Sequence, residues 1–214
     1  MIHIVDWRNR DSYNAYLDQH FLLRHEVYVG ERKWLDFAKP DGRERDQFDN
    51  EDAVYMLAIE GERVVGGSRL IPSIKPHLLS EVFPHLASSG VPRAPEIYEW
   101  TRVHVAKDRR EGRNRGTVIG HIFCAIQEYC LLHEIHSLTA LVEAWWLPYF
   151  QEMGWVIRPL DLPHLIEGEW SIAVQLMIKE ETLRTTRQLF GIEHRVLGVK
   201  PQDLSVHVGA SNGK

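Results

Sequence analysis

The sequence predicts a mixed α/β protein of the α+β class, folded as one domain around a central sheet. Two observations predict this class: a pair of β-rich segments joined by a tight turn within residues 53–71, and a strand, a helix and a strand in succession over residues 97–142. The length of 214 residues is enough for a substantial core. Since the sequence has no internal repeat and no clear linker, we assign residues 1–214 to a single domain.

The first half of the chain has the pattern of an antiparallel sheet. Apolar and aromatic side chains recur near helical period at residues 11–31, which predicts a helix. Residues 53–59 and 63–71 are rich in β-forming residues and are joined by the sequence EGER, so they predict a hairpin. Gly66 and Gly67 in the second segment predict a bulge or the close approach of another backbone.

The second half of the chain predicts a parallel connection. Residues 97–106 alternate in polarity, and residues 117–133 carry an apolar stripe at helical period. Together with a strand at residues 136–142 they have the order of a parallel crossover. The remaining expected elements are a strand at 2–5, a short helix at 143–154, strands at 155–160 and 170–178, and a closing helix at 179–191.

Composition and charge argue against several classes of protein. The net charge of -5 disfavours a general nucleic-acid binder, which is usually basic. No apolar run approaches the ~18 residues of a membrane span, and we expect no signal peptide. Cys124 and Cys130 have no metal-type spacing and face different directions of one expected helix, so we expect neither a disulfide nor a metal site. These features favour a cytoplasmic location.

A basic segment that contains glycine connects the strand at 97–106 to the helix at 117–133. Its basic residues are Lys107, Arg109, Arg110, Arg113 and Arg115, and its glycines are Gly112 and Gly116. A helix N-terminus with nearby arginines binds phosphates well. The segment resembles the loop with which N-acetyltransferases of the GNAT type hold the pyrophosphate and pantetheine of acyl-CoA. The alternatives are a solvated basic loop, or a surface that attracts an acidic carrier protein.

Charged and aromatic residues of the first half predict a pocket for a zwitterion with an additional positive charge. They are Arg24, Tyr28, Trp34, Asp46, Asp49, Arg69, Glu99 and Arg102. Carboxylates and aromatic faces favour a cation such as a sulfonium, and arginines favour a carboxylate. S-adenosylmethionine carries an amine, a sulfonium and a carboxylate. Taken singly, these residues also fit surface ion pairs, a packed ring or a solvated loop, although a glutamate in an apolar strand is unusual.

Five blocks of sequence give this interpretation its specificity. In chain order they are F-L-L-R-x-x-V-Y-x-x-E-R-x-W, E-x-D-x-F-D, V-V-G-G-S-R-L-I-P, V-F-P and Y-E-W-T-R. In order and spacing they resemble the acyl-homoserine-lactone synthases, which make quorum-sensing autoinducers. The resemblance is close over roughly residues 20–110 and diffuse beyond them.

The resemblance implies a GNAT-like acyltransferase fold of three layers, α/β/α, with one central mixed sheet. It implies an enzyme that transfers an acyl group from acyl-CoA or acyl carrier protein to the amine of S-adenosylmethionine. Lactonisation then yields N-acyl-L-homoserine lactone and releases methylthioadenosine. Both substrates react without any further cofactor, and no metal, nucleic acid or membrane takes part.

The family's functional residues map onto this chain by the same blocks. Glu99 becomes the general base, acting directly or through water, and Arg102 the second catalytic residue. Tyr28 stands where the family usually has Phe, which keeps the ring and adds a hydroxyl. The residues implied to bind S-adenosylmethionine are Arg24, Tyr28, Trp34, Asp46, Asp49 and Arg69.

The acyl site is expected mainly in the second half. Residues 1–115 would bind S-adenosylmethionine and residues 116–214 the acyl group. The family usually has Glu, a small residue, Ser, Arg and an aromatic residue in the last block, whereas this chain carries Trp100, Thr101 and Val103. A bulky Trp100 and a smaller Val103 would reshape the acyl pocket. The sequence LVEAWWLPYF also places the rings Trp145, Trp146, Tyr149 and Phe150 near the expected acyl chamber. Because large rings shorten pockets, we predict a short, branched or aromatic acyl group; packing of these rings in the core or at the surface is the alternative. The expected acyl and pantetheine residues are Trp100, Thr101, Val103, Arg109, Arg110, Arg113, Val142, Trp145 and Trp146.

Two other functions fit parts of the sequence. A GNAT-type N-acetyltransferase with a different amine acceptor would share the fold and the phosphate loop, but it would not need the acidic and aromatic blocks. A non-catalytic acyl-CoA-binding sensor would keep the pocket and would tolerate the substitution Glu99→Gln.

Overall fold

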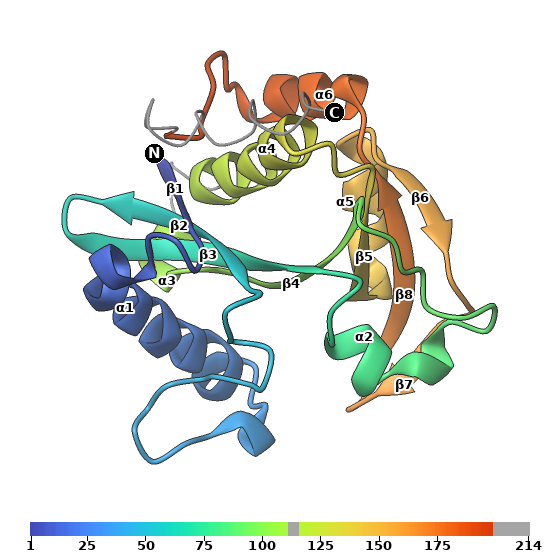
Figure 1. Ribbon diagram of the computed structural model, residues 1–214, viewed down its shortest axis with the longest axis horizontal. Coiled ribbons are helices and arrows are strands. Elements are labelled where there is room, and N and C mark those ends of the chain that lie inside the picture. The colour runs from blue at the N-terminus through green and yellow to red at the C-terminus, as the bar shows by residue number, and fades with distance from the viewer. Residues whose placement is uncertain (111–115, 199–214) are drawn as a thin grey trace, which may run out of the picture.

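A mixed sheet runs through the centre of the molecule (Figure 1). The computed structural model describes residues 1–110 and 116–198, and within them the sheet has eight strands in the order β1-β2-β3-β4-β5-β8-β6, with β7 pairing to β8. The strands are β1 (Ile2–Val5), β2 (Val54–Glu60), β3 (Arg63–Pro72), β4 (Ile97–Val105), β5 (Ser137–Glu143), β6 (Val156–Pro159), β7 (His164–Ile166) and β8 (Glu169–Met177).

Helices cover both faces of this sheet, as the three-layer prediction requires. Figure 1 shows α1 on one side of the sheet and α4 and α6 on the other. The helices are α1 (Asn14–His25), α2 (Leu78–Glu81), α3 (Lys107–Arg110), α4 (Thr117–Leu132), α5 (Leu147–Glu152) and α6 (Glu180–Phe190). Because α6 packs on the outer side of α4, α4 is buried on nearly all sides, and its Cys124 and Cys130 are buried, unpaired core residues.

The predicted antiparallel first half is confirmed. Strands β1 to β4 pair antiparallel in chain order, and the register shifts between β2 and β3 and again between β3 and β4. A Cβ atom on Gly66 would lie 2.9 Å from the carbonyl oxygen of His104, and one on Gly67 would lie 2.9 Å from His20 Nδ1. Both glycines therefore allow a close approach that any side chain would prevent.

The predicted parallel crossover is confirmed, and it has a consequence for the site. Strand β4 pairs parallel with β5, the strand that follows α4 in the sequence, but the pairing extends only from Ile97 to Glu99. Both strands continue past this point, β4 to Val105 and β5 to Glu143. Within the described residues the two strands therefore separate beyond the pair Glu99 and Thr139, and a wedge-shaped gap opens in the sheet.

Several boundaries differ from the expectation, for local reasons. The helix expected at residues 11–31 consists of a 3₁₀ turn at Arg10–Tyr13, α1, and a π-helical segment at Glu26–Glu31. Valines and a glycine in the last segment are weak α-helix formers, and π-helical turns are frequent at functional sites. Residues 107–110, expected in a loop, form α3, and the short elements α2 and β7 were not predicted.

The segment after α6 closes one edge of the sheet. Ile2 donates its N–H to the carbonyl of Val196 at 3.1 Å, and Gly198 donates to the carbonyl of Ile2 at 3.1 Å. Glu128 on α4, buried, accepts the backbone N–H groups of Val196 and Leu197. None of the helices in the described part of the chain is long and apolar enough to cross a membrane.

Candidate active site

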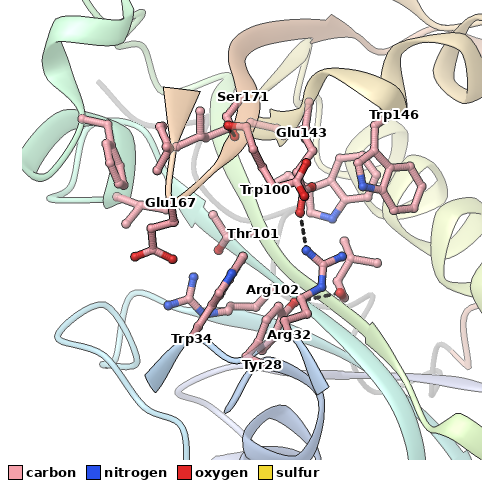
Figure 2. A pocket seen from close by; sticks show the side chains of 18 of the residues that line it. Tyr28, Arg32, Trp34, Trp100, Thr101, Arg102, Glu143, Trp146, Glu167 and Ser171 are labelled. Carbon is pink, nitrogen blue, oxygen red and sulfur yellow. Dashed lines mark hydrogen bonds and ion pairs between the residues drawn. The ribbon is translucent and has the colours of Figure 1, made fainter. Parts of the chain in front are cut away.

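The gap between β4 and β5 holds a cavity of about 210 Å³ (Figure 2). Its walls come from both halves of the chain: the π-helical segment, β4, β5, α5 and the β7–β8 hairpin. The described residues that line it are Tyr28, Arg32, Trp34, Phe37, Leu78, Phe83, Trp100, Thr101, Arg102, Val103, Phe123, Ala140, Leu141, Val142, Glu143, Trp146, Phe150, Ile166, Glu167, Glu169 and Ser171.

Aromatic rings occupy the closed end of the cavity. Trp100 directly follows the last residue of β4 that pairs with β5, so it lies where the gap begins. Its indole Nε1 donates to Ser68 Oγ at 2.7 Å, and its ring stacks on Trp155 at 6.0 Å between centroids. Phe123 meets the same ring edge-on at 5.6 Å, and Phe150 lies 5.8 Å away. With its indole hydrogen-bonded and packed on three sides, Trp100 is a fixed end wall.

A second aromatic group forms the wall on the side of α1. Tyr28 stacks on Trp34 with 5.1 Å between centroids and 18° between planes, and Phe37 lies 6.0 Å from Trp34. The Tyr28 hydroxyl donates to the carbonyl of Val103 at 2.7 Å, so the hydroxyl that distinguishes this ring from Phe ties the wall to β4. Burial raises the pKa of Tyr28 to about 12, which keeps the hydroxyl protonated as a donor.

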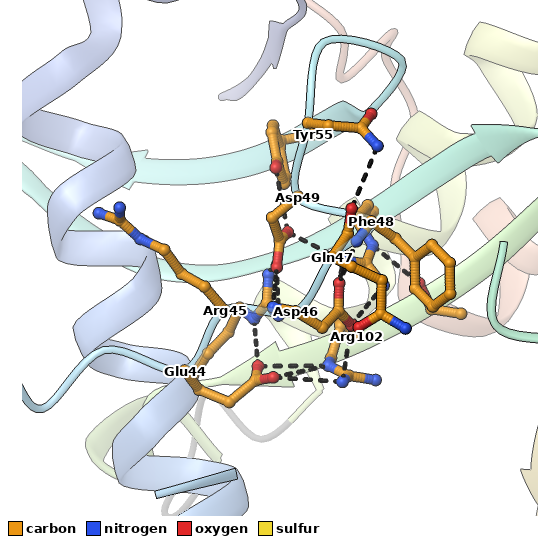
Figure 3. Close-up of polar contacts among 12 residues, drawn as sticks. Glu44, Arg45, Asp46, Gln47, Phe48, Asp49, Tyr55 and Arg102 are labelled. Atoms are coloured by element: carbon orange, nitrogen blue, oxygen red, sulfur yellow. Dashed lines mark hydrogen bonds and ion pairs between the residues drawn. The ribbon is translucent and has the colours of Figure 1, made fainter. Parts of the chain in front are cut away.

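Beneath this wall lies a buried network of three arginines and three carboxylates (Figure 3). The arginines come from α1, β3 and β4, and all three carboxylates come from the loop that precedes β2. The members are Arg24, Arg69 and Arg102, and Glu44, Asp46 and Asp49. Equal numbers of opposite charges make the burial of six ionised groups tolerable, because each charge has hydrogen-bonded partners of the other sign.

Bidentate ion pairs define the geometry of this network. The Arg24 guanidinium binds Asp49 at 2.7 and 3.0 Å, and its Nε binds Glu44 at 2.5 Å. Burial disfavours the charged carboxylate of Asp49, but Arg24 and Arg69 outweigh this effect and hold its pKa well below the usual range. Arg69 pairs with Asp46 at 2.6 and 3.0 Å. The loop of residues 44–49 is thereby fixed to three elements of the fold.

Arg102 connects the network to the cavity. It lies at the bulge between β3 and β4 with φ of 57°, a left-handed conformation that an arginine adopts only at a cost. Its Nη2 donates to Asp46 at 2.9 Å and to Glu44 at 3.2 Å, so two carboxylates hold the strained residue in place. The bulge turns the Arg102 side chain toward the cavity, which it lines.

The Glu99 carboxylate lies against the start of α2. One of its oxygens lies 3.0 Å from His77 Nδ1 and accepts the N–H of Leu79 at 2.6 Å. The other accepts the N–H of Leu78 at 3.0 Å, so the carboxylate caps the start of α2. Glu99 is fully buried and is not among the described residues that line the cavity. The role of Glu99 as general base, acting directly or through water, stays a prediction.

The other predicted residues divide into three groups. Tyr28, Trp34, Trp100, Thr101, Arg102, Val103, Val142 and Trp146 line the cavity, whereas Arg24, Asp46, Asp49 and Arg69 form the network beneath it. Trp145 is half exposed and stacks on the outer face of Trp146 at 4.8 Å. Arg109 and Arg110 lie on α3, paired with Glu60 at 2.8 Å and with Glu31 at 2.5 Å, and Arg113 lies outside the described residues.

Sequence reasoning missed several residues of the site. Glu44 is the third carboxylate of the network, and it was not assigned to the site although it is the first residue of the block E-x-D-x-F-D, which is the signal that could have found it. Arg32 and Glu143 form an ion pair at the cavity, and Glu167 points into it from the turn between β7 and β8 (Figure 2). Arg32 belongs to the first block, but Glu143 and Glu167 lie outside the blocks and more than 100 positions from it, so no sequence signal joins the three.

Comparison with known proteins now gives the family. The sequence profile described as autoinducer synthase matches residues 9–186. The chain belongs to this family. The isovaleryl-homoserine lactone synthase of Bradyrhizobium diazoefficiens is 47% identical over 193 residues, which cover 90% of this chain and 86% of that protein. The synthase is therefore an acyltransferase of the acyl-homoserine-lactone type, as its sequence blocks predicted.

Solved structures agree with this assignment and with the predicted fold. A CoA-dependent acyl-homoserine lactone synthase with SAM and isopentyl-CoA superposes on the synthase with a TM-score of 0.86 at 45% identity, over 92% of each chain. A second CoA-dependent acyl-homoserine lactone synthase has a TM-score of 0.86 at 36% identity, over 94% of this chain and 100% of that one. The GNAT-like three-layer fold is confirmed.

Proposed function

We propose that this synthase makes a short, branched-chain N-acyl-L-homoserine lactone, with CoA as the acyl carrier and S-adenosylmethionine as the source of the lactone ring. The observation that carries the proposal is the fixed aromatic end wall at Trp100, which occupies the space that a long acyl chain would need. The comparisons give further support, because an isovaleryl-homoserine lactone synthase is among the relatives and a synthase solved with isopentyl-CoA is among the similar structures.

In this proposal the pantetheine arm enters between β4 and β5. Beyond Glu99 and Thr139 the backbone amides on the facing edges of these strands no longer pair with each other, so they can bind the amides of pantetheine. The pyrophosphate would lie at the N-terminus of α4, which begins after Gly116. Arg109 and Arg110 precede it, and their exposed ion pairs are weak enough to exchange for phosphate.

S-adenosylmethionine would occupy the side of the cavity next to α1. Trp34, Tyr28 and Phe37 offer ring faces to the adenine and to the sulfonium. Arg24, Arg69, Asp46 and Asp49 would act indirectly, by fixing the loop that supports this wall. Residues 1–115 thus supply most of the S-adenosylmethionine site and residues 116–214 most of the acyl chamber, while Trp100 to Val103 border both.

The chemistry has two steps. The ammonium of S-adenosylmethionine loses a proton, the amine attacks the thioester carbonyl, and the tetrahedral intermediate expels the CoA thiol. Since Glu99 lies behind α2, a proton that reaches it would travel through water. The carboxylate of the acylated product then attacks its own γ-carbon, the C–S bond breaks, and methylthioadenosine leaves as a neutral sulfide. This step requires a folded conformer rather than an acid, and the narrow cavity can impose it.

The test is a turnover assay with purified protein, S-adenosylmethionine and a panel of acyl thioesters, each presented on CoA and on acyl carrier protein. Mass spectrometry follows methylthioadenosine and the lactone. We expect both products in equal amounts with isovaleryl-CoA, and slower turnover with straight C8 to C14 chains. Preference for a straight C8 to C14 chain would refute the acyl assignment, and free CoA without methylthioadenosine would refute the synthase reaction.

Because both substrates are intracellular metabolites, we also propose that the synthase acts in the cytoplasm.

A further inference from the structure

One ion pair joins the two walls of the cavity. Arg32, from the π-helical segment, binds Glu143, the last residue of β5, although the two are 111 positions apart in the sequence. Figure 2 shows this pair at the cavity, between the Tyr28 wall and Trp146. Both residues line the cavity, and their side chains keep 32% and 17% of their surface exposed.

This pair differs from the buried network in how easily it can open. Arg102, the other arginine among the described lining residues, is held by Glu44 and Asp46 and is 8% exposed. Removing either of its partners would leave a buried charge uncompensated. Arg32 has one carboxylate partner, and a partly exposed ion pair of this kind contributes little to stability. A ligand can therefore replace the partner of Arg32 at little cost.

We infer that Arg32 and Glu143 bind the amino-acid end of S-adenosylmethionine, Arg32 taking the carboxylate and Glu143 the ammonium. An amino acid carries both charges on one carbon, so it can insert between an arginine and a glutamate and give each a new partner of opposite sign. In this arrangement the pair is the substrate-free form of the site. The inference rests on the proposed function, and it names the residues that recognise one end of its substrate.

The surroundings of the pair support this orientation. The Arg32 guanidinium lies 5.4 Å from the centre of the Trp34 ring and 5.9 Å from that of Tyr28. A carboxylate on Arg32 therefore places the rest of the molecule, including its sulfonium, against these rings. Glu143 lies at the end of β5, on the wall that the acyl group also borders, so an ammonium bound there faces the acyl chamber.

The experiment compares two ligands by isothermal titration calorimetry. Methylthioadenosine has the adenosine and the sulfur of S-adenosylmethionine but lacks the amino-acid end. In Arg32→Gln and in Glu143→Gln we expect S-adenosylmethionine to bind about 10- to 100-fold more weakly, the loss of one charge-assisted contact. Methylthioadenosine should bind within about twofold of the wild-type affinity. Arg63→Gln, which removes an exposed ion pair with Asp108 away from the cavity, is the matched control and should bind both ligands normally.

A charge-swapped variant shows whether the Arg32–Glu143 ion pair recognises the substrate or only holds the two walls of the cavity together. Arg32→Glu combined with Glu143→Arg remakes an ion pair but reverses the charges that the substrate meets. We expect its S-adenosylmethionine affinity to stay as low as that of the single variants. The inference would be overturned if the charge-swapped variant regained its affinity for S-adenosylmethionine. It would also be overturned if the single variants bound S-adenosylmethionine and methylthioadenosine equally more weakly. Neither result would contradict the synthase reaction, which the turnover assay of the wild-type protein tests separately. A wild-type protein that does not bind S-adenosylmethionine would refute both.

Discussion

Replacing Glu44 by glutamine tests whether the buried network holds the site together. Glu44 is fully buried, and it accepts hydrogen bonds from Arg24 at 2.5 Å and from Arg102 at 3.2 Å. Glutamine keeps the volume of the side chain but removes its charge, so three buried arginines would face two carboxylates. Breaking a buried ion pair from one side costs about 3–5 kcal/mol. For a chain of this size that corresponds to a fall of about 6–20 °C in the melting temperature.

The assay is thermal unfolding followed by circular dichroism or calorimetry at neutral pH. Asp108→Asn is the control, because it breaks only partly exposed ion pairs, with Arg63 and with Arg109, and it should shift the melting temperature by less than about 3 °C. If Glu44→Gln melts within 3 °C of the wild type, the network does not carry the stability that we assign to it. A large fall with an unchanged fold at 25 °C would support the assignment.

Three further outcomes are expected. Trp100→Leu shortens the end wall, so the ratio of kcat/KM for octanoyl-CoA over isovaleryl-CoA should rise at least about tenfold; an unchanged ratio would show that Trp100 does not limit chain length. Trp34→Ala removes a ring from the S-adenosylmethionine wall, so calorimetry should find that substrate bound about tenfold more weakly with acyl-CoA binding unchanged. Burial lowers the pKa of His104 to about 4 from an unfolded value of 6.5, so the histidine is neutral when folded and its contribution is present above pH 6.5. His104 should contribute about 3 kcal/mol to the stability that denaturant titrations find lost as the pH falls from 6.5 to 4, and the neighbouring His20, whose pKa burial also lowers, adds to that loss. His104→Asn should therefore make the slope shallower by its own share, and an unaltered slope would contradict the assignment.

The elements of the fold were predictable because their signals are local. The spacing of apolar residues in α4, the turn between β2 and β3, and the two glycines of β3 each depend on a few neighbouring positions. The short elements α2, of four residues, and β7, of three residues, were not predicted, because so few residues show no recognisable periodicity. The end of the β4–β5 ladder, which makes the cavity, has no signal in either strand alone.

The sequence blocks pointed to some of the residues that gather around the cavity, but not to their arrangement. The sequence blocks identified Asp46, Asp49 and Arg69 as important, yet only their side-chain contacts reveal that they bind one another beneath the cavity. Glu99 was predicted as a general base acting directly or through water, and no sequence signal showed that two backbone N–H groups of α2 bind its carboxylate. Such contacts join residues about 20 or more positions apart, and a pattern of residue types carries no information on which of several partners each will choose.

The pairing of Ile2 with the segment at 196–198 has a consequence for synthesis of the protein on the ribosome. Among the described strands β1 is made first, and β2, which covers one edge of β1, follows some 50 residues later. The other edge of β1 forms its hydrogen bonds with Val196 and Gly198 only when nearly the whole described chain has emerged from the ribosome. Until then a nascent chain carries an open strand edge, which is a template for pairing with neighbouring chains. Premature termination before residue 196 should therefore yield an aggregating product, even though the cavity residues are all complete by then.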